Sequence, residues 1–492
     1  MILIVSLKKE VAGLLKYDDE INNYIHALNK EGINIHVEGG KIKYKCKKGA
    51  LPPEHLETIK ENKPGIIGFF EKIMNDTVPL TSIQYAYLLG KEKSCELGGI
   101  SSHYYIEYEM KNIDIDKLEA GVNELIKESD ALRMVVKKEG HMVFFRNCSK
   151  YHVERYKTDS LNGHDDVTSR MKVREAWQHK DYEIGSWPMF HFAVGKDESG
   201  AGNDVLHISF DCMILDAWSA KLMVEKLFRI YEGKEITFPE LTFKGYMKEM
   251  RDYPEDEKAL GYWEEQTKTM PLFPKLQTKK KFGEISEMIF DRVEHSFSKE
   301  ETKRLYEKCK KIAVTPASVI CTLFMKTLSD YSKNKDIAVN VTLFNRKTKK
   351  EWGNKVNEIL GEFTNNAVIR YEEKNEKLED SMKAIQKQFW NLLRYRDFEG
   401  TKILGMIADG AVGKAVMPVV YTCMLGGEVT GESFGFTETY SLSQTPQVMI
   451  DHHVRDDLGF LKISWDYVRD LFEKKYINDV FERYVENIRS FI

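Results

Sequence analysis

The sequence predicts an α/β protein with mixed sheets, preceded by a small α+β unit. Its 492 residues are 42% hydrophobic and 30% charged, a globular composition, and the length suits two to four domains. From Pro79 to the end, stretches with helical spacing of apolar residues alternate with strand-like runs. Before residue 75 the pattern differs, and one helix, one β-hairpin and two short helices are predicted there.

The N-terminal unit is predicted over residues 1–75, with 1–18 as an unassigned leader. Its elements are a helix, two alternating strand runs and two proline-initiated helices, at 19–30, 33–37, 42–46, after Pro52-Pro53 and after Pro64. Gly39-Gly40 joins the two strand runs as a hairpin turn. A core of this size is marginal, which suits a binding module better than a catalyst.

One face of the predicted hairpin carries the basic side chains of Lys41, Lys43 and Lys45. A row of lysines on a hairpin is often only a solvated face, and the sequence leaves that interpretation open. A hairpin edge is also able to accept an extended peptide, and lysines then pair with its carboxylates. The second interpretation predicts an acidic peptide as the partner.

The remaining chain is predicted to form two lobes, 79–255 and 256–492. Helices are expected at 115–128, 168–180, 219–232, 299–311, 316–331 and 379–396. Strands are expected at 101–109, 142–146, 189–195, 205–210, 337–343, 365–371, 417–423, 447–453 and 459–464. The proline-rich segment 271–274 is expected to mark the crossover between the lobes.

Composition and missing motifs disfavour several functions. A net charge of −4 gives no general attraction to nucleic acid or to an anionic membrane. The seven cysteines include no CxxC pair, so neither a disulfide framework nor a metal site is predicted. GxxxxGK[ST], HExxH and GxSxG are absent, as is GxGxxG after a strand. With no signal-like or membrane-spanning segment, the sequence predicts a cytoplasmic protein.

The segment 211–219 stands where a strand meets a helix, a common place for a site. Asp211 follows the predicted strand 205–210, and Asp216 and Ser219 precede the helix. Spacing alone favours Asp216 and Ser219 as helix caps. Cys212 lies in the turn without a basic partner in the sequence, which favours a packing role over that of a nucleophile.

This segment has the form Asp-x-x-x-x-Asp-x-x-Ser and resembles the heterocyclisation domains of nonribosomal peptide synthetases. Ordinary condensation domains of the same superfamily carry His-His-x-x-x-Asp-Gly there. Further motifs carry the resemblance in order, at 79–90, 129–133, 262–263, 270–274, 315–318, 345–346, 361–364, 418–422 and 443–452. Residues 37–51 are similar to N-terminal docking domains of the tubulysin-synthetase type.

The resemblance implies two chloramphenicol-acetyltransferase-like lobes in a V-shaped pseudo-dimer, with the site in a tunnel between them. Upstream and downstream peptidyl carrier proteins would insert 4'-phosphopantetheine arms into this tunnel, and the chain itself would bind no cofactor. An acyltransferase step would form an amide with carrier-bound Cys, Ser or Thr. A cyclodehydratase step would then give a thiazoline or oxazoline. The docking unit would bind the acidic C-terminal tail of an upstream synthetase subunit.

The resemblance also assigns roles to residues. Thr422 and Asp451 would form the cyclodehydration pair, with Asn345 and Gln447 as second candidates that orient substrate. Three roles would be structural: a buried pair of Asp216 with Arg346 between the lobes, the motif residue Ser219, and Asp211, which would shape the tunnel. Two simpler interpretations remain open: Asp451 paired with His452, His453 or Arg455, and Thr422 as an ordinary strand residue.

Three departures from the family pattern bear on cyclisation efficiency and substrate choice. His453 stands where the family often has Gln, Glu362 replaces Asp, and Cys423 replaces Ser.

Three other functions remain possible from the sequence. The first is condensation without cyclisation, and the second is a non-catalytic docking or scaffold protein. The third is an acetyl-CoA-dependent acyltransferase on the same lobe fold, which would need His-x-x-x-Asp, whereas the histidine position holds Cys212. No adenylation or carrier domain is recognisable, so the substrates would be loaded by other proteins or by other parts of a longer synthetase.

Overall fold

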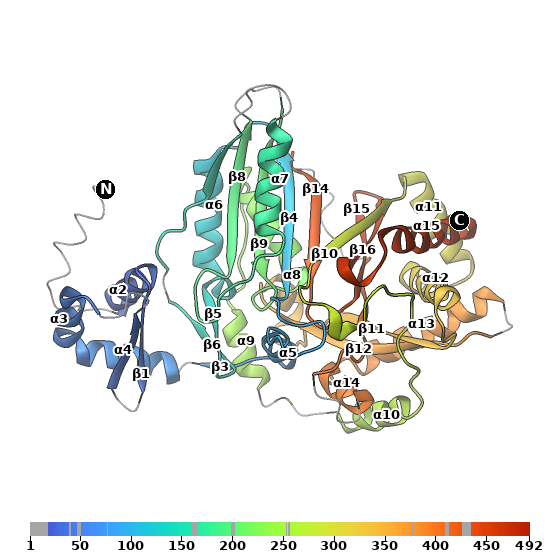
Figure 1. Ribbon diagram of the computed structural model, residues 1–492, viewed down its shortest axis with the longest axis horizontal. Coiled ribbons are helices and arrows are strands. Elements are labelled where there is room, and N and C mark those ends of the chain that lie inside the picture. Colours follow the sequence, from blue (N-terminus) through green and yellow to red (C-terminus); the bar gives the residue numbers. More distant parts are fainter. Residues whose placement is uncertain are drawn as a thin grey trace.

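The computed structural model describes residues 18–38, 41–46, 51–75, 77–146, 148–158, 165–197, 202–251, 253, 256–374, 377–408, 413–425 and 434–492. They form an N-terminal unit, a first lobe built on a five-stranded sheet and a second lobe built on a six-stranded sheet (Figure 1). The predicted leader, apart from Asp18, and the predicted Gly39-Gly40 turn lie outside the described residues.

The N-terminal unit has the elements that its sequence predicts. They are α2 (Asp18–Lys30), β1 (Ile33–Glu38), β2 (Lys41–Cys46), α3 (Pro53–Glu61) and α4 (Lys63–Asn75). The two strands pair antiparallel, with Glu38 opposite Lys41. Leu28 and Ile66 are fully buried at the centre of its small core. Figure 1 shows the unit standing beside the first lobe.

The first lobe is a sheet of order β14-β4-β9-β8-β7 with helices on both faces. Its strands are β4 (His103–Met110), β7 (Glu154–Thr158), β8 (Phe190–Asp197), β9 (Asp204–Asp211) and β14 (Thr437–Gln444). Its helices are α5 (Ser82–Gly90), α6 (Ile115–Glu128), α7 (Asp165–Trp177), α8 (Ala217–Tyr231) and α9 (Phe243–Met250). A small sheet adjoins it, of β3 (Val78–Pro79), β6 (His141–Phe144) and β5 (Met134–Lys137). Every residue of β9 is buried, because the strand lies between β4 and β8 beneath covering helices.

The second lobe is a sheet of order β10-β16-β15-β13-β11-β12, with β13 parallel to both of its neighbours. Its strands are β10 (Phe290–Ser296), β11 (Ile337–Phe344), β12 (Thr364–Tyr371), β13 (Val419–Met424), β15 (Ile450–Asp457) and β16 (Phe460–Val468). Its helices are α10 (Glu257–Thr267), α11 (Lys299–Lys311), α12 (Pro316–Tyr331), α13 (Leu378–Arg394), α14 (Gly400–Ala408) and α15 (Lys474–Phe491).

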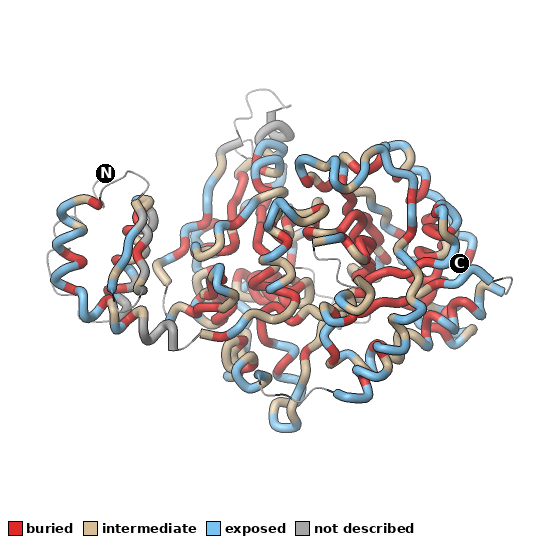
Figure 2. Tube along the Cα trace, turned by 60° about the horizontal axis from the view of Figure 1, so that its bottom comes forward, coloured by how far each residue is buried: buried red, intermediate tan, exposed pale blue. Residues whose placement is uncertain are grey.

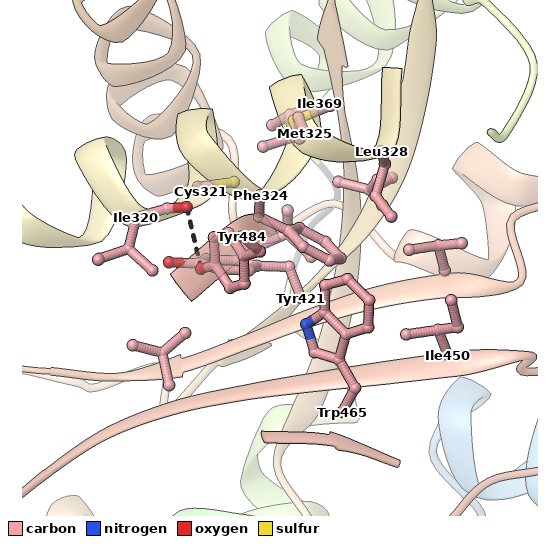
Figure 3. Packing of buried hydrophobic residues seen from close by; sticks show 14 of the residues in the cluster. Ile320, Cys321, Phe324, Met325, Leu328, Ile369, Tyr421, Ile450, Trp465 and Tyr484 are labelled. Carbon is pink, nitrogen blue, oxygen red and sulfur yellow. Dashed lines mark hydrogen bonds between the residues drawn. The ribbon is translucent and has the colours of Figure 1, made fainter. Parts of the chain in front are cut away.

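The two faces of this second sheet differ in character. Side chains alternate between faces along a strand, so Tyr421 and Trp465 point one way and their sequence neighbours the other. On the face that α12 and α15 cover, these rings pack with Phe324 of α12 and Tyr484 of α15 (Figure 3). The Tyr484 hydroxyl donates to the carbonyl of Ile320 at 3.3 Å. Figure 2 shows buried chain gathered inside each lobe. The other face of the sheet is therefore free to form a polar wall.

The predicted helices and strands are confirmed, and the bounds of 115–128, 299–311 and 316–331 match those of α6, α11 and α12. The sequence pattern did not predict the four strands at 134–137, 154–158, 290–296 and 437–444. It also did not predict the five helices at 82–90, 243–250, 257–267, 400–408 and 474–491.

Two expectations about the lobes need correction. The second half of the chain does not stay in the second lobe, because β14 pairs antiparallel with β4 of the first (Figure 1). The proline-rich segment 271–274 is not a crossover, since Trp263 before it and Leu276 after it both lie in the core of the second lobe. Hydrophobic contacts across the chain, not the prolines, decide where each segment packs.

Among the described residues no single helix is long and apolar enough to cross a membrane, although the bent pair α11 and α12 passes on length and composition alone.

Candidate functional site

A cavity of about 750 Å³ lies between the two sheets. The outward face of the second sheet forms one wall, where alternate residues of β11, β13 and β15 point into it: Asn340, Thr342, Val420, Thr422, Asp451, His453 and Arg455. The first lobe forms the other wall, from α5, β4, α8 and β14 with Tyr87, Tyr104, Ala220 and Ser443. Neither lobe encloses this space alone.

The predicted pair Thr422 and Asp451 lies in this cavity. The two residues sit on adjacent parallel strands, where Val420 pairs with Asp451 and Thr422 with His453. Both side chains are nearly buried, Thr422 at 4% and Asp451 at 5% exposed. The hydroxyl oxygens of Thr422 and Thr342 are 2.8 Å apart, so Thr422 contacts its neighbour on β11. The sheet thus places both residues on one wall of the cavity, but the hydrogen-bond partner of Thr422 is Thr342 and not Asp451.

Asp451 has one engaged and one open oxygen. Its Oδ2 accepts a hydrogen bond from Ser443 Oγ at 3.3 Å and lies 3.2 Å from His453 Nε2. Its Oδ1 is buried and accepts no hydrogen bond within the described part of the chain. Of the three partners that the sequence suggested, only His453 contacts it. His452 lies on the opposite face and contacts Tyr484, and Arg455 pairs with Glu438. The open oxygen is available to a substrate.

His453 stands between two carboxylates. Its Nε2 is 3.4 Å from Asp466 Oδ2 as well as 3.2 Å from Asp451 Oδ2. Burial alone would lower its pKa, but the two aspartates outweigh burial and raise the pKa of His453 to about 9. Arg292 binds Asp466 through two hydrogen bonds of 2.6 Å, and the pKa of Asp466 is lowered despite burial. The sequence motifs did not identify Asp466 or Arg292, because β10 and β16 meet only in the folded sheet.

Asp216, Ser219 and Arg346 join the two lobes. Asp216 caps α8 by accepting from the Ser219 amide at 2.6 Å, and Arg346 Nη2 lies 3.3 Å from the same carboxylate oxygen. Arg346 also donates to Ser219 Oγ at 2.7 Å and to the carbonyls of Val356 and Ile359. Asp216 therefore has both roles: it caps α8 and it pairs with Arg346.

A glycine allows this junction to close. Gly361 exchanges hydrogen bonds with Ser219, whose Oγ donates to the Gly361 carbonyl at 2.7 Å. A Cβ atom added at Gly361 would stand 2.2 Å from Phe243 of α9, which is far inside van der Waals contact. The segment 346–363 leaves β11, packs Val356 and Phe363 into the core of the first lobe, and returns as β12.

Three other predicted site residues have different surroundings. Asp211 does not line the cavity: it accepts from the Met213 amide at 2.9 Å within the turn, and burial raises its pKa to about 6. Asn345 does not line the cavity either, since its amide donates to the Arg396 carbonyl at 2.8 Å. Gln447 does line it, but its Nε2 donates to the Lys414 carbonyl at 3.2 Å. Only Gln447 remains a candidate for contacting substrate.

A second polar group, not identified as a site from the sequence, lies in the cavity wall around Glu362. This side chain is 1% exposed, its Oε1 accepts from the Thr364 amide, and its Oε2 accepts no hydrogen bond from a described residue. Burial and then the nearby Asp216 carboxylate raise the pKa of Glu362 well above its usual value. Both effects favour the protonated form of Glu362.

Cys212 shares this wall. It lines the cavity and packs against the core of the first lobe. Burial raises the pKa of its thiol well above the usual value. A neutral thiol is a poor nucleophile, which agrees with the packing role predicted for it.

The lysine face of the hairpin is present as a surface. Lys41 and Lys43 are exposed on β2, and Lys45 stands opposite Asn34 in the register. The side chain of Lys45 lies outside what the structure describes. The two strands pair only with each other among the described residues, which leaves hairpin edges unpaired.

Comparison with known proteins decides the family. Residues 74–492 match the model of the condensation domain, most of the chain. The chain belongs to the condensation-domain family. Residues 21–72 match the model of the TubC N-terminal docking domain, and they form the N-terminal unit.

Solved structures share the fold over most of the chain. The EpoB cyclization-docking bidomain from Sorangium cellulosum has a TM-score of 0.77 at 24% identity, over 96% of this chain and 97% of that chain. SgcC5 from Streptomyces globisporus has a TM-score of 0.67 at 13% identity, over 83% and 97%. The first of these shares both the condensation domain and the N-terminal unit.

Relatives by sequence are much longer proteins. Bacitracin synthase 1 of Bacillus licheniformis is 26% identical over 94% of this chain and 9% of its own length. Pyochelin synthetase PchF of Pseudomonas aeruginosa is 23% identical over 93% and 26%. Phenyloxazoline synthase MbtB of Mycobacterium tuberculosis is 22% identical over 86% and 30%. The chain thus spans between 9% and 30% of the length of these relatives.

Proposed function

We propose that this condensation domain is a heterocyclisation domain of a nonribosomal peptide synthetase. It would join a carrier-bound acyl or peptidyl group to carrier-bound Cys, Ser or Thr, and then cyclise and dehydrate the amide to a thiazoline or oxazoline. The observation that carries this proposal is Asp451, whose buried Oδ1 is open in a cavity between the lobes. Similarity to a phenyloxazoline synthase, a pyochelin synthetase and the EpoB cyclization-docking bidomain supports it.

Amide formation needs two thioesters held close and in line, and positioning alone accelerates such a step greatly. We assign this task to the cavity as a whole. The two lobes would correspond to chloramphenicol-acetyltransferase-like halves in a V, with a 4'-phosphopantetheine arm entering from each side. No cofactor of the chain's own is required for this chemistry.

Cyclisation needs a group that moves two protons to the amide oxygen. Asp451 would take the proton from the acceptor thiol or hydroxyl as that atom bonds to the amide carbon, and give it to the amide oxygen. It would then take the proton from the amide nitrogen and give it to the same oxygen, so that the C–O bond breaks and water leaves. Asp451 ends as the carboxylate it began as. Thr422 would orient the reacting amide from the neighbouring strand.

The partners follow from the same proposal. The upstream and downstream carrier proteins would bring their arms to the cavity, and the acidic tail of an upstream subunit would bind the hairpin at Lys41, Lys43 and Lys45. All of these reactions would take place in the cytoplasm.

The test separates amide formation from cyclisation. We expect Asp451→Asn to keep forming the linear amide while cyclised product falls by about 100-fold or more, since a positioned acid–base group contributes on that order. Intact-mass measurement of the downstream carrier follows both steps, because cyclisation appears as a loss of water after condensation.

Asp291→Asn is the matched control, since Asp291 lies on the same sheet in an exposed pair with Arg469. Cyclised product at the wild-type rate in Asp451→Asn would show that another group moves the protons. A wild-type chain that makes only the linear amide would support condensation without cyclisation instead.

A further inference from the structure

We infer that His453 is the positioning residue that holds the Asp451 carboxylate in place for cyclodehydration, acting as a cation between Asp451 and Asp466. The inference rests on the proposed function and adds a residue to it. It is carried by the placement of the imidazole within 3.2 Å and 3.4 Å of the two carboxylates.

The sheet register creates a charge conflict that needs this cation. Asp451 on β15 stands directly opposite Asp466 on β16, and like charges in that arrangement repel. Both side chains are buried, at 5% and 0% exposed, so water screens them little. Two buried carboxylates facing each other require two positive charges nearby if both are to remain ionised.

Arg292 supplies only one of these charges. It reaches from β10 and holds both oxygens of Asp466, so it is committed to that carboxylate. The remaining cation beside Asp451 is His453. Protonated His453 makes the four-residue group neutral overall, and neutral His453 leaves it with one unbalanced negative charge.

The surroundings of His453 contain no other described cation that contacts Asp451. Arg455, next on the same face of β15, is held by Glu438 of β14. His452 lies on the opposite face, where burial lowers its pKa to about 3. Thr422 of β13 and Ser464 of β16 stand beside His453 in the register and are uncharged. The titratable and charged groups of the second lobe and β14 around it are thus Asp451, Asp466, Arg292, His452, Arg455 and Glu438. Across the cavity, the first lobe adds Tyr87, Tyr104 and Cys212, and burial raises the pKa of each of these three.

This arrangement determines what His453 does during the reaction. Asp451 accepts and returns each proton through its open Oδ1, while Oδ2 stays against the imidazolium and Ser443. His453 keeps its own proton throughout. Without that proton, the Asp451 carboxylate would face Asp466 with one cation fewer and would lose the contact that orients it.

The first experiment measures ionisation without any substrate. NMR titration of the full chain with ¹³C-labelled histidine should show a signal with a midpoint at about pH 9, which disappears in His453→Gln. Other described histidines with shifted pKa values move the opposite way, with His103, His191, His207 and His452 near 3 or 4. A His453 signal that titrates below neutral pH would overturn the inference.

The second experiment measures the pH profile of cyclisation alone. A carrier protein loaded with an N-acylcysteinyl thioester is the probe, and the ratio of cyclised to linear product is read by intact mass. The wild-type ratio should fall above about pH 9, as the imidazolium is lost, toward the ratio that His453→Gln gives. His453→Gln should give the lower ratio at every pH and should lose the alkaline fall, because glutamine has no charge to lose.

His295→Gln is the matched control, since His295 lies on the same sheet beside Arg489, outside the cavity. It should keep the wild-type profile. A His453→Gln profile identical to wild type would overturn the role of His453 and leave the proposed function intact. Absence of cyclised product from the wild-type chain at every pH would overturn the proposed function, and this inference with it.

Discussion

Glu362 shows how the surroundings of a residue in the cavity wall determine the pKa of its side chain. Its carboxyl group is buried beside Asp216, and both effects favour the neutral form. Asp466 is also buried, yet Arg292 and His453 beside it lower its pKa. Neighbouring groups thus move the pKa values of buried carboxyl groups around this cavity in opposite directions.

The raised pKa of Glu362 predicts a pH-dependent effect of Glu362→Gln. A folded-state pKa above the unfolded one means that wild-type stability falls as pH rises past the usual glutamate value, by up to about 1.4 kcal/mol per pH unit. Glutamine needs no proton, so the variant should gain thermal stability relative to wild type between about pH 5 and pH 8. Differential scanning fluorimetry across this range measures the gain.

Glu264→Gln on the exposed side of α10 should show no such trend. A Glu362→Gln advantage that is the same at both ends of the range would mean that Glu362 is ionised in the folded protein.

At the scale of elements, the alternation along strands produces two surfaces of different function. Each strand of the second sheet buries one face on α12 and α15 and turns the other to the cavity. The hairpin of the N-terminal unit uses the same alternation, with Ile33 and Ile35 of β1 in its core and Lys41 and Lys43 of β2 exposed. The lysine surface is therefore a property of the hairpin and independent of the lobes.

The hairpin surface predicts charge-dependent docking. Replacing Lys41, Lys43 and Lys45 with Glu should weaken binding of a peptide with an acidic C-terminal tail, and the loss should be larger at low salt, where charges are less screened. Fluorescence anisotropy with a labelled peptide measures the affinity.

A variant with only Lys41→Glu and Lys43→Glu tests the same surface with two substitutions. Its matched control is Lys60→Glu with Lys63→Glu, two exposed lysines of α3 and α4. Equal affinities for the hairpin variant and wild type would exclude this surface as the docking site.

At the scale of the whole molecule, the cavity exists because segments cross between lobes. β14 joins the sheet of the first lobe, and segment 346–363 packs into its core. The buried pair of Asp216 with Arg346 fixes the second crossing at the start of α8. The distance between the two cavity walls therefore depends on a junction outside the reacting groups.

This junction predicts a mutational signature unlike that of Asp451. Arg346→Met leaves Asp216 buried without its cation, which should cost about 3–5 kcal/mol, and Asp216→Asn should cost less because the amide still caps α8. The double variant should recover part of the loss, since no unpaired charge remains. Thermal unfolding gives the coupling, and carrier assays should show condensation and cyclisation falling together.

Additive losses in the double variant would mean that the two side chains do not act as a pair. Loss of cyclisation alone would mean that the junction does not set the distance between the walls.

The sequence by itself determined the class of fold, most of the longer helices and strands, and the family, because periodicity and ordered motifs are local properties of a chain. It also identified Thr422 and Asp451, which the structure places on one wall of the cavity, although their roles remain a proposal. It misplaced the crossover at 271–274, and it put Asn345 in a site whose lining does not include it.

Only the tertiary structure decided what surrounds Asp451. Arg292, Glu438 and Asp466 come from β10, β14 and β16, far apart in sequence, and no spacing along the chain brings them together. Strand order and register set which side chains face each other, and these depend on hydrophobic packing over the whole sheet. The charge on His453 is fixed by that packing, because burial strengthens its interaction with two carboxylates that only the folded sheet places beside it.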